Sequence, residues 1–196
     1  RQFESEQPGA FHRIVVDDQP LHYVAIGGDD RPVVLFIHGS PDAWHGWARY
    51  LRDPELGQRA RLIAVDRPGF GGSGSGRVER SLEAQARAIA AVLERVGPGR
   101  RVVVVGHSFG GPVAVRLAID LGPRVTDLVL LAPSVDPAQE RTAWYQVVAE
   151  WPVISALVPR ELQVTNREIR ALQAELTAML PLWDRVTQRV TVVQGA

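Results

Sequence analysis

Short runs of apolar residues along the chain predict a mixed β-sheet. Two runs near the N-terminus, 11–16 and 21–26, flank the turn-forming residues 17–20, a pattern typical of a β-hairpin. Four later runs are almost continuous in Val, Ile and Leu, as expected for parallel strands buried on both faces. These four runs are residues 33–37, 61–65, 101–105 and 126–131. A last apolar run at 190–193 predicts a further strand.

Between these runs, apolar residues follow the spacing of amphipathic helices. The clearest pattern covers 81–96, where Ser81 can cap the first turn and Gly97 can end the helix. Because strands and helices alternate, the predicted fold class is α/β. We expect a mostly parallel, twisted sheet with helices on both faces, an N-terminal antiparallel hairpin and a helical cap insertion.

The cap is predicted where this alternation stops. From 137 to 181, helix-like segments follow one another without an intervening strand. The expected division is therefore a core at 1–134, a cap at 135–181 and a return to the core at 182–196. Trp144, Tyr145 and Trp151 cluster in the cap, and we expect them to wall an apolar pocket.

Residues 165–168 of this predicted cap, Thr-Asn-Arg-Glu, fit a capping box and so predict a helix that begins at Thr165. An apolar stripe follows at helical spacing, and we expect it to pack onto the core. The stripe consists of Ile169, Leu172, Leu176, Met179 and Leu180.

Composition narrows the partner class. A chain of 196 residues with 45% hydrophobic residues can bury one sizeable core. Lys plus Arg and Asp plus Glu balance at 22 each, so no basic field favours nucleic acid, and a small-molecule substrate is the expected partner. The chain has no cysteine, which excludes thiolate metal sites and disulfides. We expect no metal and no cofactor.

The compartment and the oligomeric state are not encoded in any visible signal. No apolar run is long enough to cross a bilayer, and no leader pattern is visible. The chain begins at Arg1 without a Met and stops just after an apolar run, as expected if either end has been cut. Cytoplasmic location is the default expectation, with export or anchoring left open.

The strongest chemical motif is Gly-His-Ser-Phe-Gly at 106–110, which matches G-x-S-x-G. It directly follows a predicted strand and opens the helical pattern 113–121, so Ser108 lies on a sharp strand-to-helix turn. Flanking glycines permit close backbone approach there. The helix start supplies a positive dipole end, and the N–H of Phe109 is an expected oxyanion donor.

Two further motifs follow predicted strands. His-Gly-Ser-Pro occupies 38–41, and Asp-Arg-Pro-Gly-Phe-Gly-Gly-Ser occupies 66–73. The glycines and proline of the second motif are turn residues. It lacks the G-K-[ST] of a phosphate loop, and it lacks the following helix and acidic residue of a dinucleotide fingerprint.

These motifs occur in the order and context typical of serine-nucleophile α/β-hydrolases, and the chain resembles that superfamily over essentially its whole length. The resemblance implies that Ser108 is the nucleophile and that Ser40 supplies the second oxyanion N–H from its H-G-x-P loop. It also implies that His38 supports this loop and is not the base. His12, His22 and His45 are expected to be surface or structural residues.

The catalytic acid and histidine of the family pattern are not found where the resemblance requires them. The family order is Ser, then acid, then His, but no His follows Ser108 in these 196 residues. Asp136, after the strand predicted at 126–131, is an alternative acid, against the plainer role of capping before Pro137. The sequence therefore predicts the nucleophile half of a site, and predicts that these 196 residues are nearly inactive by themselves.

The predicted function is hydrolysis of a small, fairly apolar ester, amide or activated carbon–carbon bond through an acyl-enzyme on Ser108. Relatives that cleave epoxides or carbon–halogen bonds are disfavoured because they use Asp at the nucleophile position. Two alternatives remain open: a non-catalytic, hydrolase-like binding domain, and an acyltransferase or cofactor-free peroxidase that uses the same serine.

Overall fold

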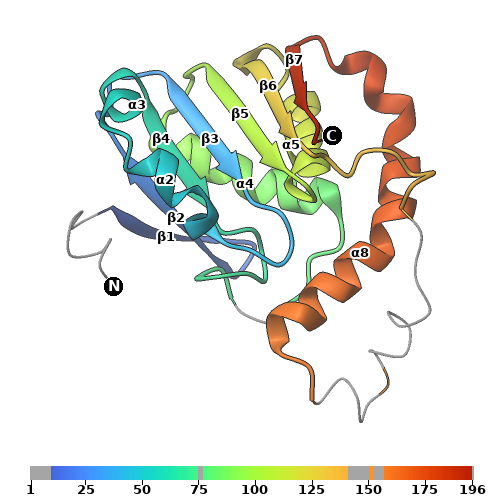
Figure 1. Cartoon of the computed structure of the whole chain (residues 1–196). Helices are drawn as coiled ribbons and strands as arrows, with labels where there is room; N and C mark the ends of the chain where they lie inside the picture. Colours follow the sequence, from blue (N-terminus) through green and yellow to red (C-terminus); the bar gives the residue numbers. More distant parts are fainter. Residues whose placement is uncertain (1–9, 75–76, 141–150, 152–156, 196) are drawn as a thin grey trace.

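A computed structural model describes residues 10–74, 77–140, 151 and 157–195. Within them, strands form a seven-stranded sheet in the order β1-β2-β4-β3-β5-β6-β7 (Figure 1). The strands are β1 Phe11–Val16, β2 Gln19–Ile26, β3 Val33–Ile37, β4 Arg61–Val65, β5 Val102–His107, β6 Val125–Leu131 and β7 Arg189–Val193. β2 pairs antiparallel with β1 and β4, and all other pairings are parallel. The predicted hairpin, parallel strands and α/β class are confirmed.

Helices cover both faces of this sheet. The α-helices are α2 Ala48–Leu51, α3 Pro54–Arg59, α4 Leu82–Val96, α5 Gly110–Leu121 and α8 Arg160–Met179, and the 3₁₀ helices are η1 Trp44–Trp47, η2 Gly122–Arg124 and η3 Leu180–Arg185. Ser81 caps α4 by accepting from Ala84 N, and Gly97 is its C-cap. This helix is therefore confirmed with both predicted caps.

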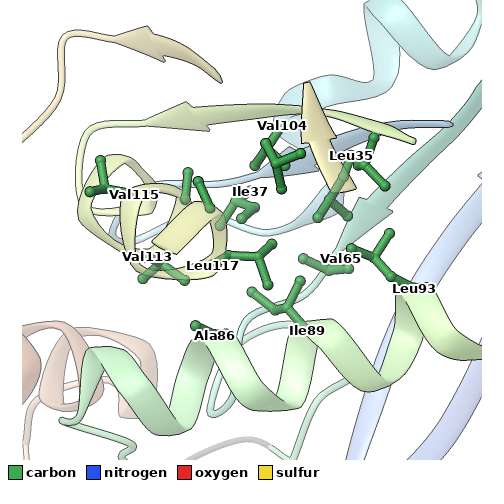
Figure 2. Packing of buried hydrophobic residues seen from close by; sticks show 14 of the residues in the cluster. Leu35, Ile37, Val65, Ala86, Ile89, Leu93, Val104, Val113, Val115 and Leu117 are labelled. Atoms are coloured by element: carbon green, nitrogen blue, oxygen red, sulfur yellow. The ribbon is translucent and has the colours of Figure 1, made fainter. Parts of the chain in front are cut away.

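Alternate residues of the central strands point to opposite faces and so build two apolar clusters. On one face, Leu35, Ile37 and Val65 pack against α4 and α5, as Figure 2 shows. Leu172, Leu176 and Met179 of α8 join the same cluster. On the other face, residues such as Phe36 and Leu62 pack against Trp47 and Leu51 from η1 and α2. The sheet is thus buried from both sides, which explains the continuous apolar strands.

The predicted capping box at 165–168 is wrong. α8 begins at Arg160, directly after Pro159, and Thr165 and Glu168 both lie inside the helix and are buried. The residue types at 165–168 match a capping box, but the Glu168 carboxylate lies in the protein interior, where it forms an ion pair with Arg67. Proline just before the first helical turn is favourable, since its missing N–H would have no partner in the helix anyway.

The apolar stripe of α8 packs onto the core as predicted at Ile169, Leu172, Leu176 and Met179, whereas Leu180 is 49% exposed. Of the aromatic cluster expected in the cap, Trp144 and Tyr145 lie outside the described residues, and Trp151 is exposed. The division into core and cap, with its boundaries, stays a prediction.

Candidate active site

Ser108 lies on the turn between β5 and α5 and has a backbone φ of +50°. A non-glycine residue in this left-handed region costs about 1–3 kcal/mol and persists only where its surroundings hold it. Here Ser108 N donates to Leu131 O at 3.0 Å, and Ser108 O accepts from Gly111 N at 2.9 Å and from Ser134 N at 3.2 Å. The turn is thus fixed by the end of β6, by the segment that follows β6 and by the first turn of α5.

The two glycines of the 106–110 motif are required by close backbone contacts. A Cβ on Gly110 would lie 2.3 Å from Ile37 O, and one on Gly106 would lie 2.5 Å from Gly110 O. Because backbone atoms cannot move aside as flexible side chains do, a larger residue would displace the helix from the sheet. The glycines therefore allow α5 to begin directly behind Ser108.

The loop at 38–41 lies against this turn. A Cβ placed on Gly39 would lie only 3.0 Å from Ser108 Cβ. Ser40 is the next residue, and Phe109, the N-cap residue of α5, follows Ser108 directly. The first N–H groups of a helix have no partner inside it, so the N–H of Phe109 is available to an incoming group. The fold therefore brings together the three residues that the sequence predicted.

A buried arginine lies behind this loop. The guanidinium of Arg67 donates from Nε to His38 O at 2.9 Å and from Nη2 to Gly39 O at 2.9 Å. It also donates to Gln85 Oε1 at 2.9 Å and to both oxygens of Glu168, at 2.8 and 3.0 Å. Arg67 and Glu168 are both 0% exposed, so the pair has no contact with solvent.

Ser40 joins this network through its side chain. Its Oγ accepts from Arg67 Nη2 and donates to Glu168 Oε1. The guanidinium lies over the rings of Phe70 and Phe109, with Cζ at 4.7 and 4.6 Å from their centroids. One cation thus contacts the loop at 38–41, the residue after Ser108 and α8.

His38 is neutral and structural in its bonding. Its Nδ1 donates to Gly39 O at 2.7 Å, and its Nε2 accepts from Arg67 N at 2.9 Å. Complete burial, together with the positive charge of Arg67, lowers the pKa of His38 to about 3. Both ring nitrogens are occupied, which agrees with the supporting role implied by the resemblance.

The other histidines also have local partners or lie at the surface. His22 Nδ1 donates to Asp66 Oδ2 at 2.8 Å, and Asp66 accepts from Trp44 N at 2.7 Å and from Gly72 N at 2.8 Å. Burial alone would raise the pKa of Asp66, but these hydrogen bonds outweigh it and lower that pKa. His107 is exposed. No hydrogen bond given for the described residues joins a histidine ring to Ser108.

Asp136 lies in a turn after β6 and is exposed. Its carboxylate accepts from Gln139 Nε2 and from Ala138 N, both at 2.9 Å, and these two hydrogen bonds lower its pKa. The geometry is that of a turn cap, and the role of alternative acid stays a prediction.

Two small open cavities border the site. One, of about 220 Å³, is lined by Asp42, Gly46, Trp47, His107 and Leu131. The other, of about 260 Å³, is lined by Pro41, Asp42, Ala43, His45, Phe70, Gly71 and Glu161. Among the described residues, no cluster of three or more His, Asp or Glu side chains could hold a metal ion, and none of the helices is long and apolar enough to span a membrane.

The sequence motifs do not predict a role at the site for Arg67 or Glu168. Arg67 belongs to the turn motif at 66–73, and Glu168 to the predicted capping box at 165–168. A signal did exist for Glu168. It stands four residues before Leu172, on the face of α8 that the apolar stripe defines, where an acidic residue needs a buried partner.

A sheet of this topology, with a strained serine between β5 and α5, defines an α/β-hydrolase fold. The chain belongs to the alpha/beta hydrolase family, whose model matches residues 34–194.

The relatives of this chain are named for different hydrolase activities. Epoxide hydrolase 1 of Caenorhabditis elegans is 33% identical over 67% of this chain and 33% of its own length. Lipase LipV of Mycobacterium tuberculosis is 31% identical over 88% of this chain and 73% of its own. A hydrolase from Pseudomonas aeruginosa has a similar structure, with a TM-score of 0.73 at 20% identity over 97% of this chain and 82% of its own. The chain spans about a third of the length of the first curated relatives.

Proposed function

We propose that this chain carries the nucleophile and the oxyanion site of a serine hydrolase. Ser108 attacks a carbonyl carbon, an acyl-enzyme forms, and the N–H groups of Phe109 and Ser40 stabilise the negative charge on the oxygen. The observation that supports this most is the left-handed Ser108, fixed between β5 and α5 with Gly39 packed against its Cβ. Preorganised donors of this kind are often the largest contribution to acyl-transfer catalysis.

The substrate class we propose is a small, fairly apolar ester, amide or activated carbon–carbon bond. The two cavities beside the site are small, and the aromatic side chains of Trp47 and Phe70 contribute to them. Although several relatives are named epoxide hydrolases, this chain has a serine at position 108. We therefore expect esters and not epoxides to be its substrates.

We further propose that these 196 residues are nearly inactive as a hydrolase by themselves. A serine hydroxyl needs a base within hydrogen-bond reach, and no histidine follows Ser108 in this sequence. Loss of the base in a serine hydrolase costs roughly a millionfold in rate.

A fluorophosphonate probe and a p-nitrophenyl ester test the proposal. The natural full-length protein is expected to be labelled at Ser108 and to hydrolyse the ester, and Ser108→Ala is expected to abolish both. Styrene oxide should not be consumed. Absence of labelling and hydrolysis in the full-length protein would instead favour a binding domain. Ester hydrolysis by the 196-residue chain at the rate of an ordinary esterase would contradict its expected inactivity.

A further inference from the structure

The Arg67 side chain holds two consecutive peptide groups of the loop that follows β3. Its Nε bonds the carbonyl of His38, and its Nη2 bonds the carbonyl of Gly39, both at 2.9 Å. The carbonyl of Gly39 and the N–H of Ser40 belong to one planar peptide group. Within the described residues the cis bond is Ser40–Pro41, so the Gly39–Ser40 peptide is trans and its C=O and N–H point in opposite directions.

The direction of the Ser40 N–H is consequently set by Arg67 together with His38, whose Nδ1 donates to the same Gly39 carbonyl at 2.7 Å. When the Gly39 carbonyl is held toward the buried guanidinium, the Ser40 N–H must point away from it. Oxyanion stabilisation depends on donor direction, because a donor must meet the charge that develops at about 2.7–3.1 Å. Without a correctly placed guanidinium, the Gly39 carbonyl would keep only its bond from His38, and the peptide could rotate and withdraw this donor.

Arg67 is itself held by α8. Glu168 lies 101 positions later in the chain, and its two carboxylate oxygens accept from Nη1 and Nη2. The same carboxylate accepts from Ser40 Oγ. Because both charged groups are fully buried, each depends on the other for its charge partner.

We propose that Arg67 and Glu168 are positioning residues, which fix the Ser40 N–H and so make the oxyanion site depend on the docking of α8. This inference rests on the proposed function, because it requires the Ser40 N–H to be an oxyanion donor. It predicts that a substitution of Glu168 on α8 alters the chemical step, although Glu168 is not among the reacting groups.

The first test compares Glu168→Gln with the parent in the natural full-length protein, using a p-nitrophenyl ester. Glutamine keeps the size and loses the charge. We expect kcat to fall about 10- to 100-fold, as a donor misplaced by about 1 Å costs up to about 100-fold, while KM changes less than about threefold. Glu94→Gln removes an ion pair with Arg124, which is bonded to Arg100 O just before β5, and should leave both constants unchanged. An unchanged kcat in Glu168→Gln would overturn the proposal.

The second test asks whether Glu168 acts through the Ser40 N–H. Ser40→Pro removes that N–H, whereas Ser40→Ala keeps it and removes only the hydroxyl. Glu168→Gln should therefore reduce kcat in the parent and in Ser40→Ala, and should cause little further loss in Ser40→Pro. A general structural role would reduce kcat equally in all three backgrounds, and that outcome overturns the proposal.

Two controls keep the result interpretable. Thermal unfolding confirms that each variant is folded at the assay temperature. If Glu168→Gln does not fold, Gln85→Met removes the neutral partner of Arg67 Nη1 and should reduce kcat in the same background-dependent way. Full hydrolysis by Ser108→Ala would refute the proposed function itself. Loss of hydrolysis in Ser108→Ala, with an equal effect of Glu168→Gln in every background, would refute only the role of Arg67 and Glu168.

Discussion

At the scale of single residues, Ser40 combines two functions that substitution can separate. Its N–H is the proposed oxyanion donor, and its Oγ bonds Arg67 and Glu168. Ser40→Pro should lower kcat on the order of 100- to 1,000-fold, the usual effect of losing one oxyanion donor. Ser40→Ala, which keeps the N–H, should lose about tenfold or less. Steady-state kinetics of both variants of the full-length protein check this, and equal losses would contradict the assignment.

His38 gives the fold a specific pH dependence. Its pKa is about 3 in the folded chain and about 6.5 when unfolded. Between these values the unfolded chain binds a proton that the folded chain does not, so stability falls as the pH drops from 6.5 toward 3. The slope reaches at most about 1.4 kcal/mol per pH unit.

The non-titrating variant His38→Gln isolates this contribution from the carboxylates. The parent should be more stable than His38→Gln at pH 7, and the difference should shrink steadily toward pH 4. Urea unfolding at several pH values measures it. A difference that stays constant with pH would mean that folding does not lower the pKa of His38.

Residue roles were predictable from sequence where they depend on backbone, and less so where they depend on distant partners. The turn geometry of the 106–110 and 38–41 motifs could be predicted from the local sequence, because close contacts at these positions require glycine. Arg67 and Glu168 are 101 positions apart, and no local pattern shows that one buried charge will meet the other. None of the described histidine rings is hydrogen-bonded to Ser108, since these rings bond elsewhere or lie at the surface.

At the scale of elements, α8 shows how a local signal can lose to tertiary packing. Thr165 to Glu168 has the residue types of a capping box, yet the helix continues through them from Arg160. The ion pair with Arg67 uses the carboxylate that a capping box would need. The buried face of α8 was nevertheless predicted correctly. Packing of the apolar stripe onto the core, and not the position of the N-terminal capping residue, determines which face of a helix is buried.

Two leucines of the predicted stripe allow a matched test of this packing. Leu176 is 1% exposed and belongs to the main core cluster, whereas Leu180 is 49% exposed. Leu176→Ala should lower the free energy of unfolding by about 2–5 kcal/mol, because it leaves a cavity where the side chain cannot be replaced by solvent. Leu180→Ala should cost about 1 kcal/mol or less. Chemical denaturation measures both, and similar costs would mean that α8 does not dock as described.

At the scale of the whole molecule, the sheet order follows from features that the sequence shows. Continuous Val, Ile and Leu runs mark strands that are covered by helices on both faces, and the hairpin places the antiparallel strands at one edge. The opposite edge is different. β7 pairs with β6 on one side, and all five of its residues are exposed. An exposed, largely apolar strand therefore forms this edge of the described sheet.

An exposed apolar edge strand offers unpaired backbone groups to another chain. Val190, Val192 and Val193 are 42%, 58% and 53% exposed, so the 196-residue chain should self-associate through β7 at high concentration. Val192→Lys places a charge on that edge and should raise the monomer fraction in light scattering, with the melting temperature changed by less than about 2 °C.

The same substitution at Val15 on β1, the other edge, serves as control. Val15 is 71% exposed, but it is the single exposed large apolar side chain of β1, whereas β7 exposes three, so Val15→Lys should change self-association little. Equal effects of the two substitutions would indicate that added charge, and not the β7 edge, controls association. If β7 is the contact, the monomer fraction responds only to position 192, because three exposed valines make β7 the more apolar of the two edges.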